Sequence, residues 1–81
     1  MSEIEIGKII HTFPKIAVAI IELREALHVG DTIHIKGAHD DFTQTVESIQ
    51  VDHNAVDHAE AGMQAGIKVI SKVHVNDRVF K

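Results

Sequence analysis

The chain twice places aspartate directly before histidine within a short interval, and both side chains can bind metal ions. The two pairs are Asp52–His53 and Asp57–His58. Imidazole nitrogen and carboxylate oxygen are common zinc ligands, but this spacing does not put both imidazoles on one face of a helix. We therefore interpret His53 and His58 as exposed loop residues and only weak metal candidates. Further histidines at turn or outward strand positions are expected on the surface: His28, His34, His39 and His74.

Other residue patterns that would support catalysis are weak or missing. The sequence has no cysteine, which excludes disulfides, thiolate zinc sites and a cysteine nucleophile. Asp40 and Asp41 are adjacent, so in extended chain they point apart, and we expect them to cap a loop rather than share a proton. The five glycines form neither a phosphate-binding loop nor a dinucleotide fingerprint. We therefore expect no enzyme activity and no cofactor.

Size and charge limit the remaining function classes. The 81 residues predict a single domain, 1–81. A net charge of -4, no tryptophan or tyrosine and only three phenylalanines argue against binding nucleic acid through backbone charge or base stacking. The sequence contains no apolar run of about 18 residues, so no membrane span is expected. The acidic start at Met1–Ser2–Glu3 is unlike a signal peptide, which predicts a native beginning and a cytoplasmic protein.

Alternation of branched apolar residues with polar residues predicts strands along the whole chain. The clearest case is 32–36, where Ile33 and Ile35 share one face and polar residues share the other. In the first strand, Ile4, Ile6 and Ile10 share one parity. The predicted strands are 3–13, 15–23, 31–36, 42–53, 67–71 and 78–81.

Three irregularities are predicted within this pattern. Gly7 interrupts the first strand and marks a bulge or a close backbone approach. The apolar residues of the strand 42–53 change parity partway, which predicts a β-bulge near Glu47–Ser48. Asn54 suits the start of a helix, so we expect a short helical turn near 55–61. The short strands and many turns together favour an all-β protein, a small antiparallel barrel.

Five stretches match a known family in their order and spacing: Ile6–Ile10, Ala17–Ile20, Leu27–Ile33, Phe42–Val51 and Ala59–Ile67. With this pattern the chain resembles the second domain of translational GTPases such as elongation factor Tu. It is also similar to stand-alone elongation-factor-like modules and to modules fused behind some U32-family peptidases. The resemblance implies a closed six-stranded antiparallel Greek-key barrel.

The resemblance also implies a binding region. In elongation factors this domain helps to bind the aminoacyl end of tRNA, along a strand and loop that match Gln50 to His53. The implied ligand-binding residues are Glu47, Gln50, Asp52 and His53. Two interpretations stay open: a non-enzymatic binding or adaptor module for RNA, tRNA or a protein of the translation machinery, and a structural accessory domain that partners a separate U32 peptidase-like or GTPase chain.

Overall fold

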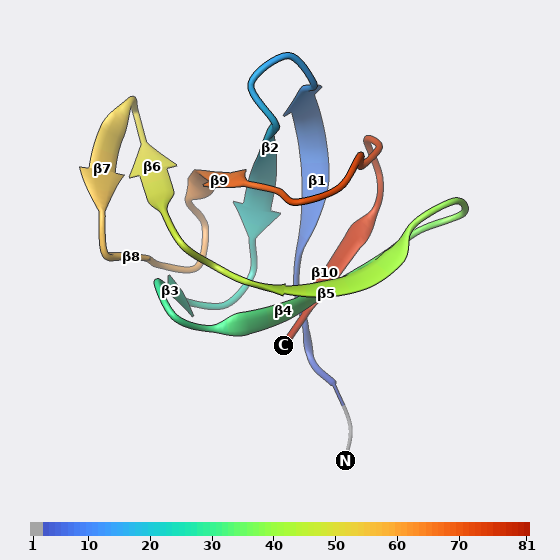
Figure 1. Ribbon diagram of the computed structural model, residues 1–81. Coiled ribbons are helices and arrows are strands. Elements are labelled where there is room, and N and C mark those ends of the chain that lie inside the picture. The colour runs from blue at the N-terminus through green and yellow to red at the C-terminus, as the bar shows by residue number, and fades with distance from the viewer. Residues whose placement is uncertain (1–2) are drawn as a thin grey trace.

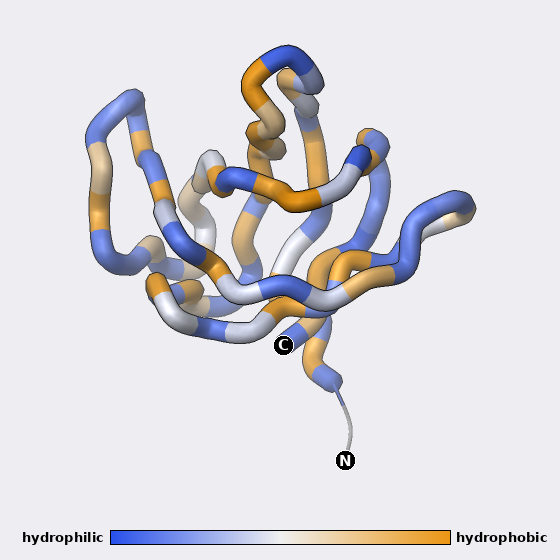
Figure 2. Tube along the Cα trace, in the orientation of Figure 1, coloured by the Kyte–Doolittle hydropathy of each residue, from blue (hydrophilic) through white to orange (hydrophobic). Residues whose placement is uncertain are grey.

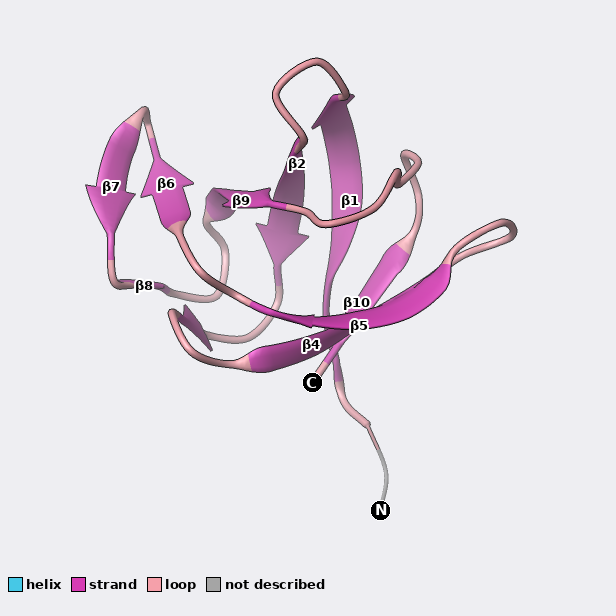
Figure 3. Ribbon diagram, viewed as in Figure 1, coloured by secondary structure: helices cyan, strands magenta, loops and turns pink. Residues whose placement is uncertain are grey.

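The computed structural model describes residues 3–81, and within them every regular element is a strand (Figures 1 and 3). The expected start at Met1–Ser2 lies outside the described residues. None of the described residues forms a helix that could cross a membrane. The ten strands are β1 (Glu5–Phe13), β2 (Val18–Leu23), β3 (Leu27–His28), β4 (Thr32–Lys36), β5 (Asp41–Thr45), β6 (Ile49–Val51), β7 (Asn54–Val56), β8 (His58–Ala59), β9 (Gln64–Lys68) and β10 (Arg78–Phe80).

Eight of the strands form one curled sheet in the order β5-β4-β10-β1-β2-β9-β6-β7. All its pairings are antiparallel, and β1–β2, β4–β5 and β6–β7 are hairpins of consecutive strands. The two strands nearest the C-terminus are inserted between earlier ones, β9 beside β2 and β10 beside β1. Strands β3 and β8 form a separate two-stranded ladder.

The sheet is an open half-barrel rather than the closed six-stranded barrel expected from the sequence. Its two edge strands, β5 and β7, are not paired with each other. After Thr45 the chain leaves β4 and continues to β6, which pairs with β9. Along this crossing, Val46 holds only two backbone hydrogen bonds, from its N–H to Asp31 O (2.8 Å) and from Gly30 N–H to its carbonyl (2.8 Å). The all-β class is therefore confirmed, and the closed barrel is wrong.

The side chain of Gln44 spans the gap in the sheet where a closed barrel would have hydrogen bonds between strands. Gln44 in β5 is 7% exposed. Its Nε2 donates to Lys68 O (2.8 Å), and its Oε1 accepts from Ile70 N–H (2.9 Å). Four strands separate β5 from β9 within the sheet, so this glutamine links two parts of the sheet that have no ladder between them.

Branched apolar side chains fill the interior of the curl. Figure 2 shows hydrophobic residues along much of β1 and β2. Ile33 and Ile35 are buried on one face of β4, as the alternation predicts. Burial of such side chains is the main favourable contribution to folding. The buried apolar residues are Ile6, Ile9, Ala19, Ile21, Leu23, Leu27, Ile33, Ile35, Val46, Ile49, Ala59, Ala65, Ile67, Val69, Val73 and Val79.

Strand β1 departs from the simple alternation predicted for it. The structure buries Ile6 and Ile9, whereas Ile4 is 60% exposed. The cause is a pair of register shifts, one before Gly7 and one after Ile9, which change the face that each following residue presents. A Cβ on Gly7 would lie 2.6 Å from Glu22 O, so the predicted bulge and the predicted close approach both occur here.

Two local predictions in the middle of the chain are wrong. Instead of a bulge near Glu47–Ser48, the strand stops at Thr45 and a new one begins at Ile49, which lets residues on both sides of the break face the core. Instead of a helical turn near 55–61, the chain forms β7 and β8. Strand pairing determines the structure of this region, because β7 pairs with β6 and β8 pairs with β3.

Candidate functional site

A groove of about 540 Å³ lies along strands β1, β2, β6 and β9. This volume is in the range of sites that hold small molecules or a few residues of a peptide. Its lining combines polar side chains of β6 and its turn with apolar side chains of the β1–β2 hairpin, and it contains no lysine or arginine. The lining residues are Ile10, His11, Phe13, Ile16, Val18, Ile20, Gln50, Asp52, His53, Gln64 and Gly66.

A strained two-residue turn presents the polar side of this groove. Asp52 and His53 connect β6 to β7, and both have positive φ, 52° and 66°. Positive φ at both central positions is the geometry of a type I′ hairpin turn, which usually takes Asn-Gly. Each non-glycine residue in this region costs on the order of 1–2 kcal/mol. The chain thus places two polar side chains at the groove where glycine would be less strained.

The opposite wall of the groove is an exposed apolar hairpin tip. Phe13 ends β1 and is 42% exposed, and Ile16 in the turn before β2 is 64% exposed. The turn is tight because Ile16 N–H bonds to Phe13 O (3.2 Å) and Pro14 follows directly on the strand. Phe13 also packs edge-on against His11, with ring centroids 4.6 Å apart. This tip and the β6–β7 turn lie at the same end of the molecule (Figure 1).

A second groove, of about 390 Å³, lies on the other side of the same hairpin. It shares Phe13 and Val18 with the first groove and continues to Ile70, which is 71% exposed. The hairpin tip therefore separates two hollows and offers apolar surface to both. Exposed apolar surface of this kind is typical of interaction sites.

Three of the four predicted ligand-binding residues lie together in the first groove. These are Gln50, Asp52 and His53, whereas Glu47 is exposed in the break between β5 and β6 and does not line the groove. That they bind a ligand stays a prediction. Ile16 was not predicted as a groove residue, although a large apolar residue two positions after Pro14 was the available signal.

The weak metal candidates are not brought into a common cluster. His58 Nδ1 bonds to Asp57 (2.8 Å), and its ring stacks on His28 with centroids 5.6 Å apart. Within residues 3–81, the one group of three side chains with metal-binding geometry is Asp40, His74 and Asp77, and neither His53 nor His58 belongs to it.

Neighbouring Asp40 and Asp41 point to different partners, and these are histidine side chains rather than the loop amides predicted for them. Asp40 bonds to His74 Nδ1 (2.7 Å), and Asp41 bonds to His34 Nε2. His34 was expected to be simply solvated, but Glu3 also contacts its Nδ1 at 2.9 Å, so both ring nitrogens face carboxylates. The hydrogen bond to Asp41 and then that to Glu3 raise the pKa of His34.

This raised pKa predicts a loss of stability above neutral pH. Below the unfolded-state value of about 6.5, His34 is charged in both states and its stabilisation is fully present. As pH rises through the higher folded-state pKa, the charge and this contribution are lost. We expect the free energy of unfolding to decrease over that interval, measured by urea denaturation from pH 6 to pH 9 with ~0.5-unit steps.

The matched variants for this prediction are His34→Gln and His53→Gln. His34→Gln should flatten the decrease, and His53→Gln should leave it in place, since among the described residues no carboxylate bonds to His53. An equal slope in the wild-type chain and in His34→Gln would contradict the role of His34.

Comparison with known proteins places this geometry in a protein class. No family model matches the chain. A crystal structure of the C-terminal domain of a proposed U32 peptidase from Geobacillus thermoleovorans, in its selenomethionine form, superposes with a TM-score of 0.91 at 22% identity, over 96% of this chain and 99% of that domain. A second crystal structure of that domain gives a TM-score of 0.87 over 93% of this chain and 88% of that one. The chain is a small domain that resembles the C-terminal domain of U32 peptidases.

Sequence relatives point the same way. An uncharacterized protease of Methanocaldococcus jannaschii is 38% identical over 79 residues, which is 96% of this chain and 19% of the protease. A collagenase of Porphyromonas gingivalis is 33% identical over 81 residues, 98% of this chain and 20% of the collagenase. The chain therefore spans about one fifth of the length of these curated relatives. The U32 part of the sequence resemblance is confirmed, and nothing in these comparisons supports the translational GTPase part.

Proposed function

We propose that this chain is a non-catalytic accessory domain of a U32-type peptidase, which contacts the peptidase portion through the β1–β2 hairpin tip and its flanking grooves. The observation that carries this proposal is the match of nearly the whole chain to about one fifth of proteins named as a protease and a collagenase. A unit that recurs as a minor part of longer proteases fits a supporting role. We retain the cytoplasm as its proposed location, since a chain without cysteine needs no oxidising compartment.

The chemistry of the grooves supports a polypeptide as the partner. Phe13, Ile16 and Ile70 offer apolar anchors at one end of the molecule. Gln50 and the turn residues Asp52 and His53 provide a polar rim. An apolar centre with a polar rim is the usual composition of protein interfaces. Contacts between domains are usually modest in area, so we expect an affinity on the order of micromolar.

The same surface disfavours RNA, the partner of the other interpretation. The first groove has no basic side chain other than histidine, and Asp52 would repel phosphate. Binding of a phosphate backbone depends on lysine and arginine that displace counterions. The second groove contributes a single lysine, Lys72. The charge of the site therefore favours a protein over tRNA.

A titration with two probes tests the proposal. The ¹⁵N-labelled chain is mixed with the Methanocaldococcus jannaschii protease from which the matching segment has been removed, and separately with a short CCA-ended RNA. We expect amide shifts at Phe13, Ile16 and Ile70 with the protease probe. Ile16→Asp should weaken this binding by at least roughly tenfold, because it places a charge in the apolar contact.

Ile4→Asp is the matched control. Ile4 is 60% exposed, close to the 64% of Ile16, but it precedes β1 at the opposite end of that strand. The control should bind as the wild-type chain does. Shifts with RNA and none with the protease probe would overturn the accessory role, and equal weakening by both variants would overturn the assignment of the surface.

A further inference from the structure

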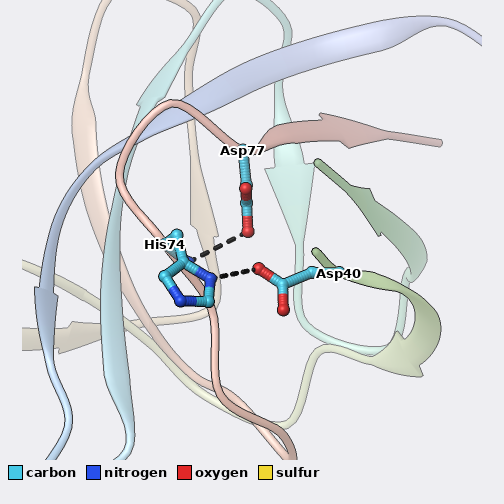
Figure 4. A group of neighbouring side chains, drawn as sticks. All are labelled: Asp40, His74 and Asp77. Carbon is cyan, nitrogen blue, oxygen red and sulfur yellow. Dashed lines mark hydrogen bonds and ion pairs between the residues drawn. The ribbon is translucent and has the colours of Figure 1, made fainter. Parts of the chain in front are cut away.

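A second cluster of polar side chains, none of which lines either groove, lies where two turns meet. Asp40 belongs to the turn between β4 and β5, and His74 and Asp77 belong to the turn before β10 (Figure 4). One ligand atom from each of the three lies within 4.8 Å of the other two. Figure 4 shows the imidazole and both carboxylates directed toward one another. Residues 34 positions apart in the chain are thus brought to one point.

The backbone of both turns holds these side chains in place. His74 N–H donates to Asp77 Oδ2 (3.0 Å), and Asp77 N–H donates to His74 O (3.1 Å). The other turn is closed by Gly37 N–H, which donates to Asp40 O (2.7 Å). A Cβ on Gly37 would lie 1.9 Å from Asp77 Oδ1, so only glycine leaves room for this carboxylate. The three side chains are therefore fixed before any ligand arrives.

Burial makes this arrangement of charges costly without a positive partner. Asp77 is 4% exposed, and the side chain of Asp40 is 9% exposed. Within residues 3–81, the protein donors that reach this pair are the backbone N–H and the ring of His74. Two carboxylates that meet out of water need a proton or a cation between them.

We propose that Asp40, His74 and Asp77 bind one Zn²⁺ ion. An imidazole nitrogen with carboxylate oxygens is a ligand set that suits zinc, whereas calcium and magnesium take oxygen alone. The Nδ1–Oδ2 distance of 2.7 Å between His74 and Asp40 has to open only to roughly 3.3 Å around a tetrahedral ion with bonds of about 2 Å.

Bound zinc would join the β4–β5 turn to the turn before β10. A ligand that binds only the folded state raises its stability by mass action. Both turns border the pairing of β10 with β4, the strand that completes the middle of the sheet. The ion would therefore act as a cross-link near the edge strand β5, at the other end of the strand order from β7.

Isothermal titration of the untagged chain with ZnCl₂ tests the site. We expect one zinc ion per chain, a rise in Tm with zinc, and no comparable heat with MgCl₂ or CaCl₂. His74→Gln and Asp40→Asn should each weaken zinc binding by at least roughly tenfold. The side chain of His74 is 47% exposed, so its replacement should leave the fold intact, which the amide spectrum checks.

A second histidine–aspartate pair provides the matched control. His58 and Asp57 also hydrogen-bond, at 2.8 Å, but lie outside the three-residue cluster. His58→Gln and Asp57→Asn should bind zinc as the wild-type chain does. The proposal is overturned by the absence of heat and of amide shifts at millimolar zinc, or by binding that survives in His74→Gln and is lost in His58→Gln.

Discussion

Ile21→Ala is expected to remove a large part of the stability of this domain, about 2–5 kcal/mol. Ile21 lies in β2, the strand between β1 and β9, and is 0% exposed. It pairs with Ile9 on one side and Ala65 on the other, so neighbours on both sides line the cavity that the substitution leaves. A small domain has only about 5–15 kcal/mol to lose. Urea denaturation followed by circular dichroism measures the change.

Ile70→Ala is the control, since it makes the same chemical change at a residue that is 71% exposed. The hydrogen bond of Ile70 to Gln44 uses its backbone N–H and is retained. We expect a change within about 0.5 kcal/mol. If both substitutions cost the same, β2 would not be the centre of the core, and the buried positions of the sheet would need to be reassigned.

Gln44→Leu is expected to cost roughly 2–4 kcal/mol, although it places an apolar residue of similar size in a buried position. The amide of Gln44 satisfies two backbone groups, Lys68 O at 2.8 Å and Ile70 N–H at 2.9 Å. Each buried polar group left without a partner costs about 1–3 kcal/mol. Because this side chain links β5 to the end of β9, we also expect faster amide hydrogen exchange in both segments.

Gln64→Leu is the matched control for this prediction. Gln64 is exposed at the start of β9, where its side chain lines the first groove. Its replacement should change stability by no more than about 0.5 kcal/mol. A neutral result for Gln44→Leu would show that water replaces the amide, and that the opening of the half-barrel does not need this link.

The two proposals use different residues, although the second groove reaches Val73, which is next to His74 in the chain. The grooves flank the β1–β2 hairpin and draw on β6 and β9, whereas the proposed zinc ligands come from the turns that border β10. Disruption of one should leave the other intact, since Ile16 is in the first and His74 in the second. Zinc binding by Ile16→Asp and protease binding by His74→Gln would show this independence directly.

Local sequence patterns predicted those strands in which pairing with neighbouring strands agrees with the local preference for extended structure. Thr32–Lys36 alternates and is a strand, with Ile33 and Ile35 inside. Gly7 was correctly predicted to lie close to a neighbouring backbone segment, because the sequence shows directly that this residue has no side chain. The predictions failed where pairing with other strands overrides the local preference. In 55–61, β7 and β8 form instead of the expected helical turn.

The sequence by itself determined that the protein is all-β and that Gln50, Asp52 and His53 lie close together, because alternation and chain adjacency are local properties. Only the tertiary structure decided that the sheet stays open, that Ile16 joins those residues in a groove, and that Asp40 meets His74 and Asp77. These outcomes depend on which distant strands pair and in what register. That choice is made by the burial of the whole core, which no short stretch of sequence contains.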